Sequence, residues 1–145
     1  MLDTQNSMET ICTASAAATM KAAADFSKTL SGGEVLALYG DLGAGKTVFA
    51  KGLAKGLGIA GEVTSPTYII MNEYMGGRLR LCHYDMYRTD ETNARNLGLH
   101  ENFGRPGTVC VVEWPENIGA LLPGNAIKVH ISPGEGNERN IETIP

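Results

Sequence analysis

Residues 40–47, which read GDLGAGKT, constrain the fold more than any other part of the sequence. They match the pattern G-x-x-x-x-G-K-[ST], in which backbone N–H groups surround a phosphate group. The glycines of such a loop let the backbone approach the phosphate, the lysine reaches the outer phosphates, and the threonine hydroxyl ligates magnesium. We therefore expect a bound nucleoside diphosphate or triphosphate. The positions concerned are Gly40, Asp41, Leu42, Gly43, Ala44, Gly45, Lys46 and Thr47.

The residues on both sides of this loop support the prediction. Residues 34–39 form a short apolar run that is typical of a buried parallel strand. Residues 46–58 carry apolar side chains near helical spacing, and Gly58 is a plausible C-cap. The N-terminus of that helix would direct its partial positive charge at the phosphate.

The rest of the chain predicts a mixed sheet. Residues 63–74 and 78–87 are rich in strand-forming residues, and Gly76 and Gly77 between them predict an antiparallel hairpin. The further expected elements are an edge strand at 10–14, a helix at 16–30 with Ser15 as N-cap, a helix at 92–103, a buried strand at 108–114, a short helix at 116–122, and strands at 126–131 and 139–144. We therefore predict one α/β domain over residues 1–145, a P-loop NTPase-like fold whose mixed sheet contains an antiparallel hairpin.

Charge and hydropathy restrict the cellular location and the binding partners that we expect for the chain. A formal net charge of −4, with basic residues scattered apart from Lys46, Lys51 and Lys55, argues against direct high-affinity RNA binding. No apolar run approaches membrane-spanning length, and residues 1–21 lack the pattern of a secretion signal. We expect a cytoplasmic protein without membrane contact.

The three cysteines, Cys12, Cys82 and Cys110, show neither metal-ligand spacing nor a C-x-x-C pair. Each lies in a strand-like context, so buried reduced thiols are expected.

Two acidic residues could complete the site. Glu113 ends an apolar run, so its strand would bring it to the same sheet edge as the loop, although it could be an ordinary solvated strand-end acid. Asp85 alternates with His83 and Tyr87 on one strand face, which could equally be a solvated face. Residues 64–68, TSPTY, could form a switch segment that senses the γ-phosphate, or an ordinary turn around Pro66.

The identity of the nucleotide base is inferred from motifs that the sequence lacks. Neither an N-K-x-D guanine-reading motif nor a D-x-x-G switch occurs, so adenine is favoured over guanine.

Four motifs in series, GDLGAGKT, SPTY, HYDMYR and VEWPE, resemble the TsaE (YjeE) family over nearly the whole chain. These are small bacterial ATPases required for making threonylcarbamoyladenosine beside the tRNA anticodon. The resemblance implies ATP on residues 40–47, with Thr47 and Glu113 on Mg²⁺. It also implies an essential Asp85 near the γ-phosphate, a switch-like segment at 65–67 with Thr67 as a catalytic candidate, and Arg139 near the nucleotide.

The resemblance further implies that the chain does not modify tRNA itself. It implies binding to a TsaB–TsaD pair and use of ATP to reset that complex, so tRNA is met only indirectly. One departure is Val48, where the family usually carries a second threonine after the lysine. Because Thr47 keeps the metal position, at most a modest effect on affinity is expected.

Two other functions stay open at this point. A small-molecule kinase would need arginines to clamp both phosphates, and only Arg88, Arg95 and Arg105 are candidates, without a lid insertion. A nucleotide-dependent binding module without significant turnover is the other alternative. A comparison of ATP hydrolysis with and without the TsaB–TsaD pair would separate the three.

Overall fold

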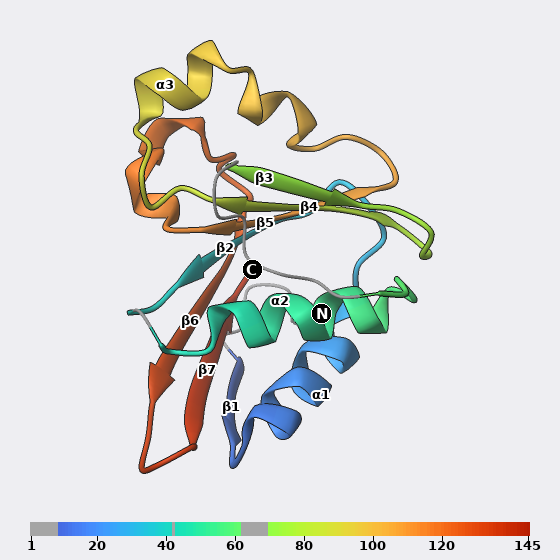
Figure 1. Ribbon diagram of the computed structural model, residues 1–145, viewed down its shortest axis with the longest axis vertical. Coiled ribbons are helices and arrows are strands. Elements are labelled where there is room, and N and C mark those ends of the chain that lie inside the picture. Colours follow the sequence, from blue (N-terminus) through green and yellow to red (C-terminus); the bar gives the residue numbers. More distant parts are fainter. Residues whose placement is uncertain (1–8, 42, 62–69) are drawn as a thin grey trace, which may run out of the picture.

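A seven-stranded mixed sheet forms the centre of the protein (Figure 1). The computed structural model describes residues 9–41, 43–61 and 70–145. The sheet order is β1-β7-β6-β2-β5-β4-β3, in which β6, β2, β5 and β4 are parallel while β1, β7 and β3 pair antiparallel. The strands are β1 (Glu9–Thr13), β2 (Val35–Tyr39), β3 (Met71–Tyr74), β4 (Arg80–Asp85), β5 (Thr108–Glu113), β6 (Ile127–Pro133) and β7 (Arg139–Ile144).

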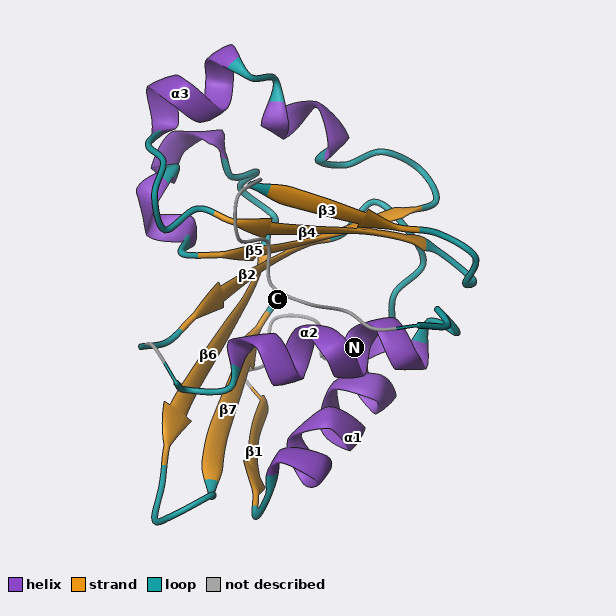
Figure 2. Ribbon diagram, viewed as in Figure 1, coloured by secondary structure: helices purple, strands orange, loops and turns teal. Residues whose placement is uncertain are grey.

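Helices cover both faces of this sheet (Figure 2). One core lies under α1 (Ala16–Ser27) and α2 (Lys46–Gly56), with Phe49 and Leu53 packed on the sheet. A second core on the other face includes Ala94 and Ile118, beneath α3 (Glu91–Asn96), η2 (Leu99–Asn102), η3 (Pro115–Asn117) and η4 (Gly119–Leu121). The strands β2, β4 and β5 contribute buried side chains to both cores, as buried parallel strands do. β6 buries one face and exposes the other.

The helices α1 and α2 approach unusually closely through two glycines of α2. A Cβ atom added at Gly52 would overlap the carbonyl oxygen of Met20, and one at Gly56 would overlap Ser27 and Ala24. No side-chain layer therefore separates the helices at these points, so α2 is fixed firmly against α1.

The antiparallel hairpin of β3 and β4, the edge strand and the mixed sheet are confirmed. Residues 63–69, which hold the start of the expected first hairpin strand and the expected switch segment 64–68, lie outside the described residues. Ser15 does cap α1, its side chain accepting a hydrogen bond from the N–H of Ala18 at 3.1 Å. The predicted helices are too long, since α1 ends at Ser27 and the segment 92–103 breaks at Gly98, whose φ is 68°. Residues 116–122 form two short 3₁₀ turns rather than one helix.

The cysteine prediction is right for Cys82 and Cys110, which are buried free thiols, and wrong for Cys12, which is exposed. The cause is its place on β1, an edge strand whose residues lie mostly in solvent.

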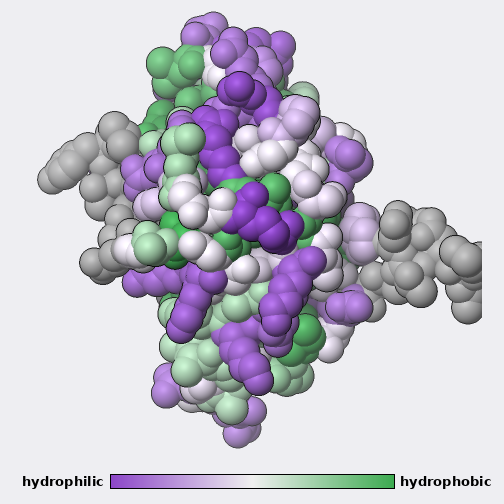
Figure 3. Space-filling model, turned by 90° about the vertical axis from the view of Figure 1, so that its right-hand side faces the viewer, coloured by the Kyte–Doolittle hydropathy of each residue, from purple (hydrophilic) through white to green (hydrophobic). Residues whose placement is uncertain are grey.

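The surface mixes polar and apolar residues. On the face shown in Figure 3, hydrophilic and hydrophobic side chains are interspersed. Within the described part of the chain, the large hydrophobic side chains that are exposed come from four separate segments: Ile11, Met75, Tyr87 and Leu97. None of the described helices is long and apolar enough to cross a membrane.

Candidate nucleotide-binding site

The phosphate loop connects the end of β2 to the start of α2. Gly45 is the N-cap of α2 with φ 106°, a left-handed conformation that favours glycine. Gly40 has φ 157°, and a Cβ there would lie 2.6 Å from the carbonyl oxygen of Ile131 on β6. The glycines of the motif are therefore required by the backbone path. Leu42 lies outside the described residues.

Lys46 is the first residue of α2, and its side chain is buried. It is only 5% exposed, and its Nζ has no hydrogen-bond partner within the part of the chain that the structure describes. Burial lowers the pKa of the Lys46 ammonium, although the negative charges of Glu113, Glu116, Asp85 and Asp41 oppose this shift. A buried cation without a hydrogen-bond acceptor is costly, and an incoming phosphate would supply acceptors.

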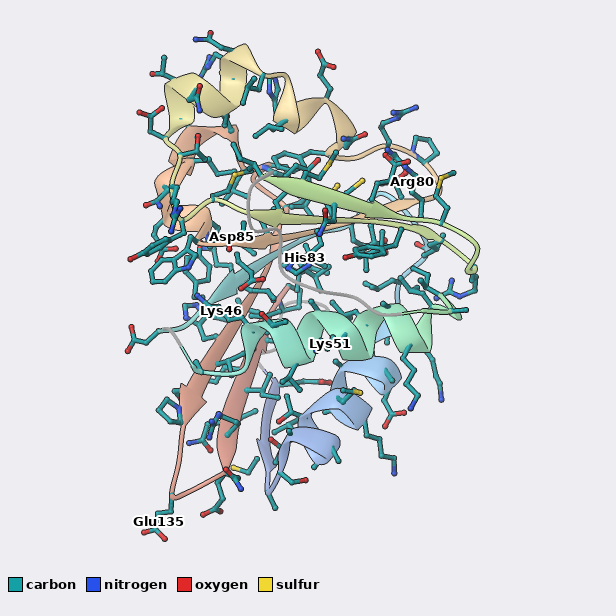
Figure 4. All side chains as sticks on the ribbon, viewed as in Figure 1. Lys46, Lys51, Arg80, His83, Asp85 and Glu135 are labelled. Atoms are coloured by element: carbon teal, nitrogen blue, oxygen red, sulfur yellow. The ribbon has the colours of Figure 1, made fainter. Side chains whose placement is uncertain are left out.

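The sheet register brings the two predicted acids together. Leu38, just before the loop, is paired with Glu113 in β5, and Glu113 is paired with Asp85 in β4. Both acids are the last residues of parallel strands, so they lie at the end of the sheet where the loop begins. Figure 4 shows Asp85 at the end of β4, on the side of the sheet that holds Lys46. Open α/β sheets bind their ligands at this edge.

Glu113 is buried and bonded to a histidine. Its Oε2 lies 2.5 Å from Nε2 of His83, whose side chain is fully buried. Glu113 is therefore not a solvated strand-end acid, because only 4% of the residue is exposed. Asp85 is half-buried, and its Oδ1 accepts a hydrogen bond from the N–H of Tyr87 at 3.0 Å.

Arg139 at the start of β7 contacts the loop itself. Its Nε donates to the carbonyl oxygen of Ala44 at 3.0 Å, and a terminal nitrogen donates to that of Gly43 at 3.4 Å. The residue thus contacts the loop through backbone carbonyl groups. A contact between Arg139 and the nucleotide stays a prediction.

The acidic residues fit a magnesium ion that is held mainly through phosphate. In residues 9–41, 43–61 and 70–145, no three His, Cys, Asp or Glu side chains gather as a metal cage. Magnesium usually keeps several waters and binds through one or two carboxylates and the substrate phosphates, so no such cage is needed. Thr47 and Glu113 remain the predicted ligands, and Thr67 lies outside the described residues.

A small cavity of about 60 Å³ adjoins the loop on the side of α1. Its lining residues are Ala16, Thr19, Gly45, Val48, Asn137 and Arg139. The family departure at Val48 therefore faces this cavity, beside the phosphate loop.

Sequence reasoning missed two contacts at this site. It placed His83 on one strand face with Asp85 without a role. For Trp114, next to Glu113, it predicted only a fluorescence signal that responds to nucleotide binding nearby. The Trp114 ring lies under the Lys46 ammonium, with Nζ 3.8 Å from the ring centroid. The available signal was the position of a lone tryptophan between a strand-end acid and Pro115.

Comparison with known proteins identifies the family. The model of the family described as threonylcarbamoyl adenosine biosynthesis protein TsaE matches residues 13–141. The chain belongs to the TsaE family. The predicted family, the fold class and the nucleotide-binding tRNA-processing assignment are thereby confirmed.

Individual relatives agree with the TsaE assignment. The chain is 48% identical over 109 residues to a tRNA threonylcarbamoyladenosine biosynthesis protein TsaE of Bacillus subtilis, covering 75% of this chain and 68% of that one. A TsaE of a Nostoc species is 38% identical over 122 residues, covering 81% and 74%. The crystal structure of Bacillus subtilis YdiB superposes with a TM-score of 0.79 and 37% identity, covering 95% of this chain and 86% of that one.

Proposed function

We propose that this TsaE protein binds Mg-ATP and hydrolyses it to reset a complex of TsaB and TsaD homologues that forms threonylcarbamoyladenosine on tRNA. The observation that carries the nucleotide part is the buried Lys46 ammonium, which has no hydrogen-bond partner in the described residues and lies at the start of α2. This group lies beside the glycine backbone of a phosphate loop and two strand-end acids. Such an arrangement is suited to the outer phosphates of a nucleotide.

Each residue has a role that follows from its chemistry. The loop N–H groups and Lys46 would bind the phosphates, and Thr47 and Glu113 would hold Mg²⁺. Magnesium, when bound, neutralises phosphate charge and favours departure of the leaving group. Asp85 would act on the γ-phosphate side, where a carboxylate can orient an attacking water. Arg139 would keep the loop in shape through its two carbonyl contacts.

The partner part of the proposal rests on family membership and charge. A chain with a net charge of −4 and no concentrated basic run is poorly suited to hold tRNA alone. Its nucleotide cycle would then serve other proteins that do hold tRNA, in the cytoplasm. The TsaE descriptions of its relatives concern tRNA threonylcarbamoyladenosine biosynthesis and agree with this role.

The nucleotide part is tested by replacing the ammonium. Lys46→Met should lose at least about tenfold in affinity for Mg-ADP by calorimetry, because a charged hydrogen bond to phosphate is removed. The variant should unfold at about the same denaturant concentration as the parent chain, since the buried ammonium that it removes has no hydrogen-bond partner in the described residues. Lys51→Met, on the same helix, is the matched control and should bind normally (Figure 4). Normal binding by Lys46→Met would refute the loop assignment.

The partner part is tested by single-turnover hydrolysis at saturating Mg-ATP. The isolated chain should hydrolyse slowly, because Arg139, the one arginine that the resemblance implies near the nucleotide, is engaged with the loop backbone. Stabilising the transferred phosphoryl charge commonly contributes on the order of 10³ in rate. Adding the TsaB–TsaD pair should therefore accelerate hydrolysis strongly. Equal, fast rates with and without the pair would mean that the chain is self-sufficient.

A further inference from the structure

Trp114 has a backbone conformation that tryptophan seldom adopts. Among the described residues it is the one non-glycine residue with positive φ, at φ 57° and ψ 49°. Such a conformation costs energy and persists where neighbouring structure enforces it, often at functional sites. Here the residue lies between the end of β5 and Pro115 of η3, and its carbonyl accepts a hydrogen bond from the N–H of Asn117 at 3.1 Å.

The bend at Trp114 places its ring against the phosphate loop. Nζ of Lys46 lies 3.8 Å from the indole centroid, well within the range of a cation–π contact. The ring of Tyr87 packs against the indole at a centroid distance of 5.0 Å and an angle of 51°. The indole is therefore held from two sides: by its own backbone and by a neighbouring aromatic ring.

The surroundings of Lys46 make this contact unexpected. Four carboxylates influence its ammonium, those of Glu113, Glu116, Asp85 and Asp41. A charge this close to opposite charges could form an ion pair with one of them. None of the ion pairs found in the described part of the chain includes Lys46.

We infer that Trp114 is a positioning residue that holds the Lys46 ammonium on its ring and keeps it out of ion pairs with acidic side chains of the site. This inference rests on the proposed nucleotide binding. A cation on an aromatic face keeps its N–H donors available, whereas a carboxylate would occupy them. A phosphate can then bind Lys46 without first displacing an acidic side chain, and Glu113 and Asp85 stay available for their own roles.

The contact is tested first without any nucleotide. Trp114 is the single tryptophan of the chain, so its fluorescence reports this ring alone. Lys46→Met removes the charge next to the indole and should shift or change the intensity of its emission in the ligand-free protein. Lys51→Met should leave the emission unchanged. Identical emission from Lys46→Met and the parent chain would overturn the inference, whatever the protein does with nucleotides.

The positioning role is tested by two replacements of similar bulk. Trp114→Phe keeps an aromatic face, and its affinity for Mg-ADP by calorimetry should stay within about threefold of the parent chain. Trp114→Leu is apolar without that face, and its affinity should fall about tenfold. An equal loss of Mg-ADP affinity in both variants, or no loss in Trp114→Leu, would overturn the inference. Either result would mean that Trp114 contributes only apolar packing.

A second substitution separates positioning from loss of structure. Glu116 is exposed and is not a predicted metal ligand, yet its negative charge acts on the Lys46 ammonium. Adding Glu116→Gln to Trp114→Leu should recover part of the lost affinity, because one competitor for the ammonium is gone. No recovery at all would contradict capture by carboxylates. If the parent chain itself binds no Mg-ADP, the proposed function fails, while the fluorescence comparison still decides whether the contact exists.

Discussion

His83 and Glu113 form a buried polar pair near the carboxyl ends of the neighbouring strands β4 and β5. The two side chains come from adjacent parallel strands, and both are almost completely hidden from solvent. Nδ1 of His83 has no hydrogen-bond partner in the described residues, so the bond to Glu113 is the main interaction that offsets its burial. A histidine in this position fixes the carboxylate orientation, as outer partners of metal-binding carboxylates commonly do.

Substitution of Glu113 should separate its stability role from its binding role. Glu113→Gln keeps an oxygen for His83 and should fold nearly as stably as the parent chain, with weakened magnesium dependence of nucleotide binding. Glu113→Ala leaves His83 unpaired and should lower the free energy of unfolding by about 1–3 kcal/mol. Urea denaturation measures the first effect and magnesium titration the second. Glu135→Ala, an exposed residue in the β6–β7 connection, is the control and should change neither.

The helix pair α1 and α2 sets how firmly the loop is supported. The close contact at Gly52 and Gly56 leaves no room for a side chain, so the backbone of α2 packs directly against α1. Since the loop runs directly into α2, the position of Lys46 depends on this contact. An intrinsic weakness of α2, two glycines within eleven residues, is thus offset by tight packing.

Gly52→Ala should destabilise the fold although alanine is the better helix former. The gain in helix propensity is about 1 kcal/mol. Against it stands overlap of the methyl group with the backbone of Met20, which cannot move aside like a flexible side chain. Forced overlap of this kind costs typically about 1–3 kcal/mol, and the backbone case lies at the upper end. A net loss should appear in urea denaturation, whereas Lys55→Ala on the exposed face should be neutral or slightly stabilising. A stabilised Gly52→Ala would contradict the close contact.

Elements with one strong physical cause could be predicted from the sequence. The strands β2 and β5 follow from continuous apolar runs, and the loop follows from its glycines and Lys46. The close approach at Gly52 could not be predicted, because a glycine inside a helix indicates only weakness until its neighbour is known. The contact between Lys46 and Trp114 was equally hidden. It depends on the left-handed backbone of Trp114, which residue preferences argue against.

At the scale of the whole molecule, the loop is held by parts of the chain that are distant in sequence. β2 lies between β5 and β6, and Arg139 reaches the loop from β7, 95 residues away from Ala44. Strand order of this kind is not encoded in a local pattern, so the sequence placed Arg139 near the nucleotide only by resemblance. The same guanidinium also donates to the carbonyl oxygens of Gly136 and Glu138, which ties the β6–β7 connection to the loop.

Arg139→Gln should loosen the loop without unfolding the sheet. Loss of two charged hydrogen bonds to Gly43 and Ala44 should lower Mg-ADP affinity about tenfold, because the loop must then be ordered on binding. Amide hydrogen exchange at residues 43–46 should become faster in the ligand-free variant. Arg95→Gln, which removes an exposed pair with Glu91, should affect neither measurement. Unchanged exchange at the loop would show that Arg139 does not hold it.

The position of Arg139 in the sequence also affects when the phosphate loop can gain this contact during synthesis. β7 pairs with β6 just before it and with β1 from the opposite part of the chain, and Thr13 is the partner of Arg139 in that second pairing. Contacts between residues so far apart form late, because the intervening chain must first be brought together. A nascent chain on the ribosome holds the complete phosphate motif long before Arg139 is made. Its loop can gain this anchor only after residue 139 has been made, so a product truncated before β7 would carry the motif but should bind a nucleotide weakly.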